Sequence, residues 1–300
     1  MILEYIVKDN KYKNIKQIAK EYFNMSERLI IKLKNKKLIF KNNQTAFINE
    51  FVKFNDKISF NLDYEEDNDN IVPTKMDFKV LFEDESLLII NKPPFTPIHP
   101  SSSHFSDSLS NAVKYYYKEK NINKKIRPVN RLDKDTSGIV IFAKNEYIQE
   151  CLIKQMKQNT FEKFYLAITE GNFIDKTGII NVPIARKENS IIERKVSEDG
   201  QNAITHFKVV KEFSNSLNPT KEVYSLVEFK LETGRTHQIR VHSAYINHPL
   251  LGDTLYNKTS PLINRQALHC YKLNFIHPIT KENIEIISDL PSDMKNIITV

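Results

Sequence analysis

The sequence RPVNRLDKDTSGIVIFAK, residues 127–144, decides how the rest of the chain is interpreted. Its second half, GIVIFA at residues 138–143, is a β-branched and aromatic apolar run, which predicts a buried strand. Charged residues precede this run, Asp133 among them, and Thr136 and Ser137 supply turn chemistry. A loop that feeds a buried strand is held by a rigid element, and reactive groups are often positioned in this way. Asp133 is therefore the first candidate for a functional residue.

Length and composition describe a soluble globular chain with room for a sizeable core. The 300 residues are 40% hydrophobic, which suits one large domain or two unequal ones. Residues 1–19 lack the apolar segment of a signal peptide, and no apolar run approaches the roughly 18 residues that cross a bilayer. We therefore expect a cytoplasmic protein with no membrane partner. Cys151 and Cys270 are far apart in the sequence, which predicts two inert thiols and no disulfide framework.

The positive charge of the chain is confined to its N-terminal fifth. Residues 1–60 hold 13 Lys and Arg against 6 Asp and Glu, and this difference of 13 − 6 = +7 equals the net charge of the whole chain. Helical spacing predicts one helix at residues 14–23 and a second one capped by Ser26, with apolar residues facing inward. The cations expected on the outward face of the second helix are Arg28, Lys32, Lys34, Lys36 and Lys37, and Arg28, Lys32, Lys36 and Lys37 are the candidates for RNA contact. Such a face suits a phosphate backbone, although an ordinary solvated surface fits equally well.

The pattern of elements predicts two domains. Short strands are expected within residues 38–62, and the acidic, aperiodic DYEEDNDNIVPT at residues 63–74 indicates a linker. We predict domains at residues 1–63 and 77–300, joined by residues 64–76. In the second domain, we expect a hairpin from residues 78–90, helices at residues 107–117 (capped by Asp107) and 147–158, and strands near residues 164–168, 178–183, 203–210, 224–232 and 284–287. This mixture indicates an α+β fold with a largely antiparallel sheet.

Several common chemistries find no motif in this chain. Its six glycines form neither a G-x-G-x-x-G sequence nor a P-loop, so no nucleotide cofactor is expected. There is no H-E-x-x-H, no zinc-like Cys and His spacing and no G-x-S-x-G elbow, so neither a metal site nor a serine hydrolase is expected.

A second dense cluster of polar groups is LETGRTHQIRVH at residues 231–242. A predicted strand leads into Thr233 and Gly234, and Arg235, His237 and Arg240 follow. Together they form a concentration of donors suited to phosphates and carboxylates. Taken alone, the cluster also fits a charged turn or an exposed strand end in solvent.

Six motifs, in order, resemble the pseudouridine synthases of the RluA type, which act on ribosomal and transfer RNA. They are IINKPPFTPIHP (89–100), NRLDKDTSGIVIFAK (130–144), KFYLAITEG (163–171), LETGRTHQIRVH (231–242), HPLLGDTLY (248–256) and RQALHCYKLNFIHP (265–278). The resemblance implies the pseudouridine synthase fold and a reaction without a cofactor. It makes Asp133 the catalytic aspartate, Tyr165 the aromatic that stacks on the target base, and Arg240 the cation paired with Asp133. Arg131 would fill the space left by the extruded uridine, and the RNA-contacting set is completed by Asn130, Arg235 and His237.

Residues 1–63 resemble the compact RNA-binding domain of ribosomal protein S-four, and the departures from both family patterns are local. Asn130 stands where the synthases usually have His, and Phe95 and Thr96 replace the usual glycine after the Lys-Pro pair. Asn55 and Asp56 occupy a loop where the S-four domain usually has glycine. None of these changes removes a proposed catalytic group, and Asn130 is expected to adjust loop support or substrate choice.

The residue types fit the isomerisation of uridine. The base must be detached from ribose, turned and rejoined through ring carbon five, which requires an extruded nucleotide, an aromatic platform and an ionised carboxylate. Burial disfavours the ionised carboxylate and a neighbouring arginine opposes that effect, which gives Arg240 a role. We therefore predict a monomeric RNA pseudouridine synthase. The alternative is a catalytically idle RNA-binding or ribosome-assembly protein on the same fold. A glycoside hydrolase would need a second carboxylate across the bond, and Asp135 is too close in sequence to Asp133.

Overall fold

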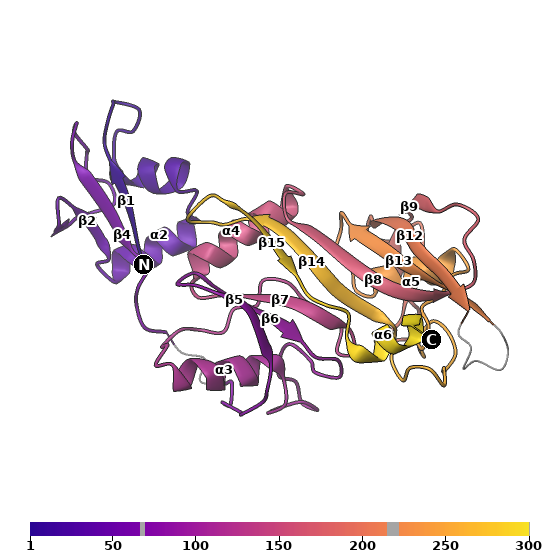
Figure 1. Cartoon of the computed structure of the whole chain (residues 1–300). Coiled ribbons are helices and arrows are strands. Elements are labelled where there is room, and N and C mark those ends of the chain that lie inside the picture. The colour runs from indigo at the N-terminus through magenta and orange to yellow at the C-terminus, as the bar shows by residue number, and fades with distance from the viewer. Residues whose placement is uncertain (67–69, 215–221, 300) are drawn as a thin grey trace.

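The apolar strand predicted in the opening stretch is β7 (Ser137–Ala143), and it lies inside the main sheet of the molecule (Figure 1). The computed structural model describes residues 1–66, 70–214 and 222–299. All residues of β7 are buried, because β6 (Leu87–Lys92) covers one edge of the strand and β14 (Leu268–Ile276) the other. The prediction of a buried strand is confirmed.

The main sheet is largely antiparallel. Within the described residues it has nine strands, in the order β5-β6-β7-β14-β8-β13-β12-β9, with β15 paired to β14 beside this path. The other strands are β5 (Lys79–Glu83), β8 (Glu162–Glu170), β9 (Thr177–Asn181), β12 (Ile204–Ser214), β13 (Val223–Leu231) and β15 (Asn283–Ile287). β7 and β14 run parallel, whereas the other pairs described are antiparallel. The predicted α+β fold is confirmed.

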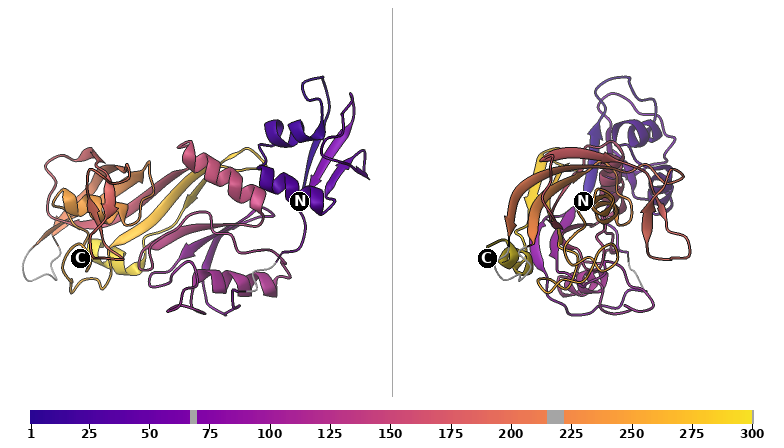
Figure 2. Two further views of the ribbon diagram at one scale, coloured as in Figure 1. Left: turned by 180° about the vertical axis from the view of Figure 1, so that it is seen from behind. Right: turned by 90° about the vertical axis from the view of Figure 1, so that its right-hand side faces the viewer.

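The continuous apolar run of β7 is explained by helices on both faces of this part of the sheet. The helices of the second domain are α3 (Leu109–Glu119), α4 (Glu146–Lys157), α5 (Gln238–Tyr245) and α6 (Ser292–Thr299), and a small hairpin joins β10 (Ile184–Arg186) to β11 (Arg194–Val196). Ile139 and Ile141 belong to the same apolar cluster as residues of α4, whereas Val140 and Phe142 belong to the cluster of α3. Figure 2 shows α3 and α4 on opposite sides of β5, β6 and β7. No helix among the described residues has the length and apolar character that crossing a membrane requires.

Helix α3 starts later than predicted. Ser108, not Asp107, is its N-cap, and its side chain forms a capping box with Asn111. The Asp107 carboxylate instead lies 2.8 Å from Nδ1 of His104. The prediction of Asp107 as the cap was therefore wrong by one residue, since both residue types can cap a helix and only the local turn distinguishes them.

Residues 1–62 form a smaller sheet with its own helices. Its strands are β1 (Ile2–Ile6), β4 (Lys57–Asn61), β2 (Ile39–Lys41) and β3 (Gln44–Thr45), in that spatial order, and its helical segments are α1 (Ile15–Gln17), the π-helical η1 (Ile18–Tyr22) and α2 (Glu27–Asn35). Ser26 caps α2 as predicted, its Oγ accepting a hydrogen bond from the Leu29 amide at 3.2 Å. β1 was not predicted, because the apolar Ile2 and Ile6 stand at exposed positions of this edge strand, so its sequence lacks the apolar–polar alternation although its burial alternates.

Helix α4 joins the two parts of the molecule. Lys32 lies 2.9 Å from both Glu66 and Glu146, and Ser26 Oγ donates to Glu150 at 2.6 Å. Lys32 therefore faces the second domain, and the prediction that it points outward with the other cations of α2 was wrong. The acids that hold it lie far away in the sequence, where a helical pattern carries no information about them.

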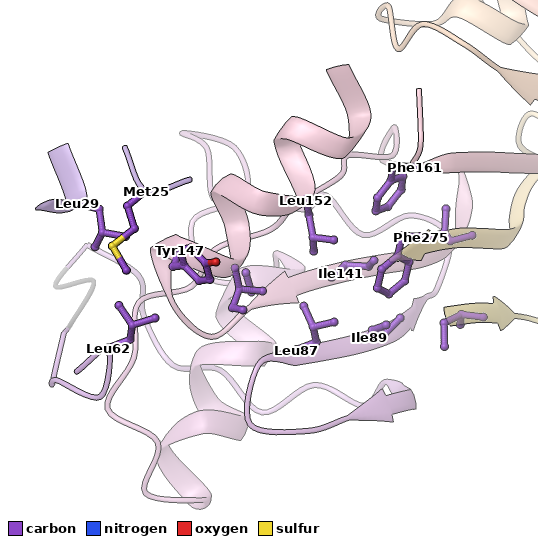
Figure 3. Packing of buried hydrophobic residues seen from close by; sticks show 14 of the residues in the cluster. Met25, Leu29, Leu62, Leu87, Ile89, Ile141, Tyr147, Leu152, Phe161 and Phe275 are labelled. Atoms are coloured by element: carbon purple, nitrogen blue, oxygen red, sulfur yellow. The ribbon is translucent and has the colours of Figure 1, made fainter. Parts of the chain in front are cut away.

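A single apolar cluster crosses the same joint. Figure 3 shows Met25, Leu29 and Leu62 of the N-terminal part beside Tyr147 of α4. The described part of the predicted linker is also held in place, since Glu66 pairs with Arg127 at 2.6 Å. The domain boundary at residue 63 stays a prediction, but the segment that follows it packs against both sides.

Replacing Gly138 by alanine should lower the free energy of unfolding by on the order of 3 kcal/mol, because the new methyl group would overlap the backbone of β14. Gly138 has φ of 122°, and a Cβ atom there would lie 2.3 Å from the carbonyl oxygen of Cys270. Gly234→Ala is the control, since its Cβ would meet the flexible end of Lys163 at 3.2 Å. Urea unfolding followed by circular dichroism measures both variants. An unchanged midpoint for Gly138→Ala would contradict the close approach of β7 and β14.

Candidate active site

A cleft of about 600 Å³ opens beside the loop that precedes β7. Its wall is formed by this loop, the C-terminal half of α4, the start of β8 and the segment between β13 and α5. The three predicted catalytic residues and four of the predicted RNA-binding residues line it together: Asn130, Arg131, Asp133, Tyr165, Arg235, His237 and Arg240. Residues far apart in the chain thus share one concave surface, which is the first requirement of an active site.

Asp133 presents a partly accessible carboxylate to the cleft. Its side chain is 30% exposed, and Oδ2 accepts a hydrogen bond from Nη1 of Arg240 at 3.3 Å. Nε2 of His237 lies 3.8 Å from the same oxygen, beyond hydrogen-bond distance. The carbonyl oxygen of Asp133 accepts from the Thr136 amide at 3.1 Å, which closes the turn into β7. The backbone that carries this acid is therefore fixed by the strand.

Arg240 lies between two carboxylates. Its Nε and Nη2 donate to Asp253 at 2.7 Å each, and its Nη1 remains for Asp133. The Asp253 side chain is fully buried and also accepts from the amides of Leu255 and Tyr256. Burial opposes the charge, but pairing with Asp253 and Asp133 raises the pKa of Arg240. Arg240 is thus a permanently charged, oriented cation.

Arg240 belongs to helix α5, whereas the sequence suggested a turn or an exposed strand end for this cluster. The helix begins after His237, whose φ of 59° is left-handed. Gln238, Arg240 and His242 are all buried polar residues, so the segment lacks an amphipathic pattern. Asp253 was also missed as a partner, because the sequence marks it only as a residue following Gly252.

His237 is oriented by a chain of hydrogen bonds. The Tyr256 hydroxyl accepts from the Arg194 amide at 2.8 Å and lies 2.9 Å from Nδ1 of His237. A hydroxyl oxygen can accept two hydrogen bonds as well as donate one, so this contact fits either tautomer of the ring, and Nε2 is the nitrogen that faces Asp133. Burial lowers the pKa of His237, although Asp133 opposes this. The ring is accordingly neutral at pH 7.

Tyr165 and Lys163, on the same face of β8, form part of the cleft wall. Tyr165 is 6% exposed, and burial raises the pKa of its hydroxyl well above the usual range, so it stays protonated. Lys163 is half-buried and has no carboxylate partner among the described residues. Burial lowers the pKa of Lys163. Its position in K-x-Y was visible in the sequence, but only the fold places its amine in the cleft.

Lys92 ties the loop after β6 to the loop that carries Asp133. Its Nζ donates to the carbonyl oxygens of Pro93 and Thr96 at 2.9 Å and of Lys134 at 2.8 Å. Burial lowers the pKa of Lys92 to about 7, and three acceptors favour the protonated amine, which has three donors. In the loop so held, Phe95 has φ of 63°, a conformation that favours glycine.

The predicted RNA-binding residues divide into three groups. Asn130 is 5% exposed, and its amide bonds the backbone of β7 at Ile139 and Ile141, 2.9 Å in each case. This geometry favours loop support, one of the two roles expected for Asn130. Arg131 and Arg235 are exposed at the cleft.

The cations of α2 form the third group and do not reach the cleft. Arg28 and Lys37 are exposed on the N-terminal part, and Lys36 lies 5.2 Å from the ring centroid of Tyr64. These residues stay candidates for RNA contact at a separate surface.

Comparisons with known proteins agree with this geometry. Residues 86–245 match the family model described as RNA pseudouridylate synthase. The RNA pseudouridine synthase YhcT of Bacillus subtilis strain 168 is 43% identical over 85% of this chain and 82% of its own length. Ribosomal large subunit pseudouridine synthase D of Blochmanniella floridana is 33% identical over 89% of this chain and 87% of its own.

The fold is also that of a solved structure from this family. The human RNA Pseudouridylate Synthase Domain Containing 1 superposes with a TM-score of 0.59 at 23% identity, over 71% of this chain and 83% of the human one. The family match spans more than half of the chain, and it includes β7, β8 and the segment leading into α5. The chain therefore belongs to the RluA-type family of RNA pseudouridine synthases.

Proposed function

We propose that this enzyme converts specific uridines of ribosomal RNA into pseudouridine, with Asp133 as its catalytic carboxylate. The observation that carries the proposal is the accessible Asp133 carboxylate at the cleft wall, 3.3 Å from the oriented Arg240. The choice of ribosomal RNA rests on the similarity to a relative named for the large ribosomal subunit. Transfer RNA is the alternative substrate within the same reaction class.

The chemistry requires an ionised Asp133 inside a cleft that closes over the base. The carboxylate either attacks the sugar carbon or takes a proton from the two-prime carbon, and both routes need its charged form. A bound base displaces water and disfavours that charge, while Arg240 stabilises it. Asp253 is the positioning residue, because it fixes the guanidinium from the side away from Asp133.

The remaining residues of the cleft suit an extruded nucleotide. Removing a base from its stack costs a few kcal/mol, and stacking on an aromatic ring repays part of it. Tyr165 provides that ring. Lys163 and Arg235 carry positive charges for phosphate or base oxygens, and Arg131 occupies the space that the uridine leaves in the RNA. Residues 1–63, with the S-four-like pattern and the charge excess of 13 − 6 = +7 in residues 1–60, capture the RNA through Arg28, Lys36 and Lys37.

Asp133→Asn should reduce pseudouridine formation by about a thousandfold or more, because the amide can neither attack nor accept the proton. RNA affinity should change by no more than about threefold. The assay incubates purified protein with unmodified ribosomal and transfer RNA and maps pseudouridine chemically. Asp135→Asn, two residues along the same loop, is the control and should keep its activity. An active Asp133→Asn enzyme would refute the assignment, and no product from the wild type in either RNA would refute the proposed function.

Tyr165→Leu should lower kcat/KM by about tenfold or more, since base stacking contributes about 1–3 kcal/mol. Tyr165→Phe keeps the ring and should stay within about fivefold of the wild type. Steady-state kinetics measures both, and thermal unfolding checks that each variant is folded at the assay temperature. If the Phe variant is as impaired as the Leu variant, the hydroxyl and not the ring carries the function.

Asp253→Asn should lower both stability and activity, because Arg240 loses its bidentate partner. Breaking a buried ion pair costs about 3–5 kcal/mol of unfolding free energy. At a temperature where the variant stays folded, kcat/KM should also fall by about tenfold or more, since a displaced guanidinium no longer orients and pairs with the Asp133 carboxylate. Asp293→Asn is the matched control. Asp293 holds Arg265 bidentately, with N···O distances of 2.7 and 3.0 Å, and neither residue lines the cleft. A loss of kcat/KM in both folded variants, or in neither, would contradict the positioning role.

A further inference from the structure

Three phenylalanine rings of the N-terminal part are left in water. Phe47, Phe51 and Phe54 are 75%, 74% and 66% exposed, and all lie on the loop between β3 and β4. Scattered apolar residues are normal on protein surfaces, but three large exposed rings within eight residues of one loop are a concentration that an interaction site would explain. None of the three belongs to the predicted cationic face of α2.

The backbone beneath these rings is fixed. Residues 48–56 run antiparallel beside residues 7–16 and are bonded to them at several points. The amide of Lys16 donates to Ile48, that of Val52 to Lys13 and that of Asn55 to Val7, at 2.8, 3.1 and 2.9 Å. Phe51 also forms an isolated β-bridge with Asn14. The backbone that carries the exposed rings is therefore already ordered, and little backbone entropy is lost when a partner binds.

Four exposed lysines lie on these same two segments. Lys8, Lys11, Lys13 and Lys53 have no carboxylate partner among residues 1–66, 70–214 and 222–299. By contrast, the acids of the region are engaged locally. Asp9 accepts from the Lys11 amide, Glu50 from the Phe47 amide, and Asp56 from the Lys53 amide and the Lys41 ammonium. We call the surface formed by Phe47, Phe51, Phe54, Lys8, Lys11, Lys13 and Lys53 the basic aromatic strip.

We propose that the basic aromatic strip binds unpaired RNA nucleotides, with bases stacked on Phe51 and Phe54 and phosphates held by the lysines. This proposal rests on the proposed capture of RNA by the N-terminal part and names the form of RNA that it captures. Flat rings alternating with cations are the chemistry that single-stranded nucleic acid requires, because every base has a face and every nucleotide a charge. A duplex has no free base faces on which these rings could stack, since its bases are already stacked on one another. Lysines are depleted in the centre of protein interfaces, which disfavours a protein partner.

The strip is a surface separate from the α2 face that the sequence indicated. On α2, Lys32 forms an ion pair with Glu146 of α4, and Lys36 packs on the ring of Tyr64. Arg28 and Lys37 remain there for phosphates alone, since that set of candidates includes no aromatic ring. The N-terminal part thus has one surface suited to any RNA backbone and a second one suited to unpaired bases.

The test uses the full-length chain, because the apolar cluster shared with α4 makes truncation disruptive. Phe51→Ala/Phe54→Ala is compared with Phe105→Ala, which removes a ring that is 64% exposed on the second domain. Fluorescence anisotropy measures affinity for a single-stranded oligonucleotide and for a blunt-ended duplex of two complementary strands. The double variant should bind the single strand at least about tenfold more weakly and the duplex with unchanged affinity, while Phe105→Ala binds both normally.

A second pair of variants tests the cations. Lys13→Gln/Lys53→Gln should reduce the slope of log affinity against log salt by about 1.4 for the single strand, which corresponds to two phosphates. The Phe double variant should keep the wild-type slope.

The outcomes separate this inference from the proposed function. Wild-type affinity of the Phe double variant for the single strand overturns the strip, even if Arg28→Gln/Lys37→Gln weakens binding and the enzyme makes pseudouridine. Equal losses of affinity for the single strand and for the blunt-ended duplex also overturn it. If the Phe51→Ala/Phe54→Ala variant loses binding to anionic phosphatidylserine vesicles but keeps the RNA affinity of the wild type, the strip binds a lipid surface and the proposal is overturned. Failure of the wild type to form pseudouridine refutes the proposed function and leaves the binding result to stand alone.

Discussion

The Arg240 guanidinium is the group on which the rest of the site depends. A buried cation is tolerated only when its donors are paired, and here Asp253 takes two of them and leaves a third for Asp133. This arrangement links helix α5 to the loop after Gly252 and to the loop before β7. Three segments distant in the chain are therefore held in one geometry by a single planar side chain, and a lysine could not replace it.

Asp133 carries a partly accessible negative charge in a cleft whose wall also includes cationic and neutral donor groups. Tyr165 stays protonated, and the His237 ring is neutral with its Nε2 facing the carboxylate. Lys163 adds a positive charge without a partner among the described residues. Family membership favours an enzyme over the alternative of a catalytically idle RNA-binding protein. The electrostatics of the cleft explain in physical terms how an anionic group is kept reactive there.

The sequence predicted those features that are encoded locally. The apolar run of β7, the Ser26 cap, the antiparallel character of the sheet and the grouping of Asp133, Tyr165 and Arg240 followed from short patterns and from motif order. Other features depend on partners distant in the chain. Arg240 lies on a helix with buried polar residues, so no amphipathic pattern in the sequence predicted the helix. The pairing of Arg240 with Asp253 is a tertiary contact. Lys32 has the spacing of a surface cation, yet Glu66 and Glu146 turn it inward.

Helix α4 has a consequence for substrate choice that lies in distance and not in contacts. Its first turn, at Glu146 and Glu150, is bonded to the N-terminal part, and its last turns, at Ile153 and Met156, line the cleft. At about 1.5 Å per residue the helix is a rigid spacer of roughly 18 Å. An RNA that engages both ends has to present its captured segment and its target uridine at a matching separation. If the N-terminal part captures RNA as proposed, the length of this helix sets the distance between the captured segment and the target uridine, and the three-dimensional shape of the RNA contributes to its recognition.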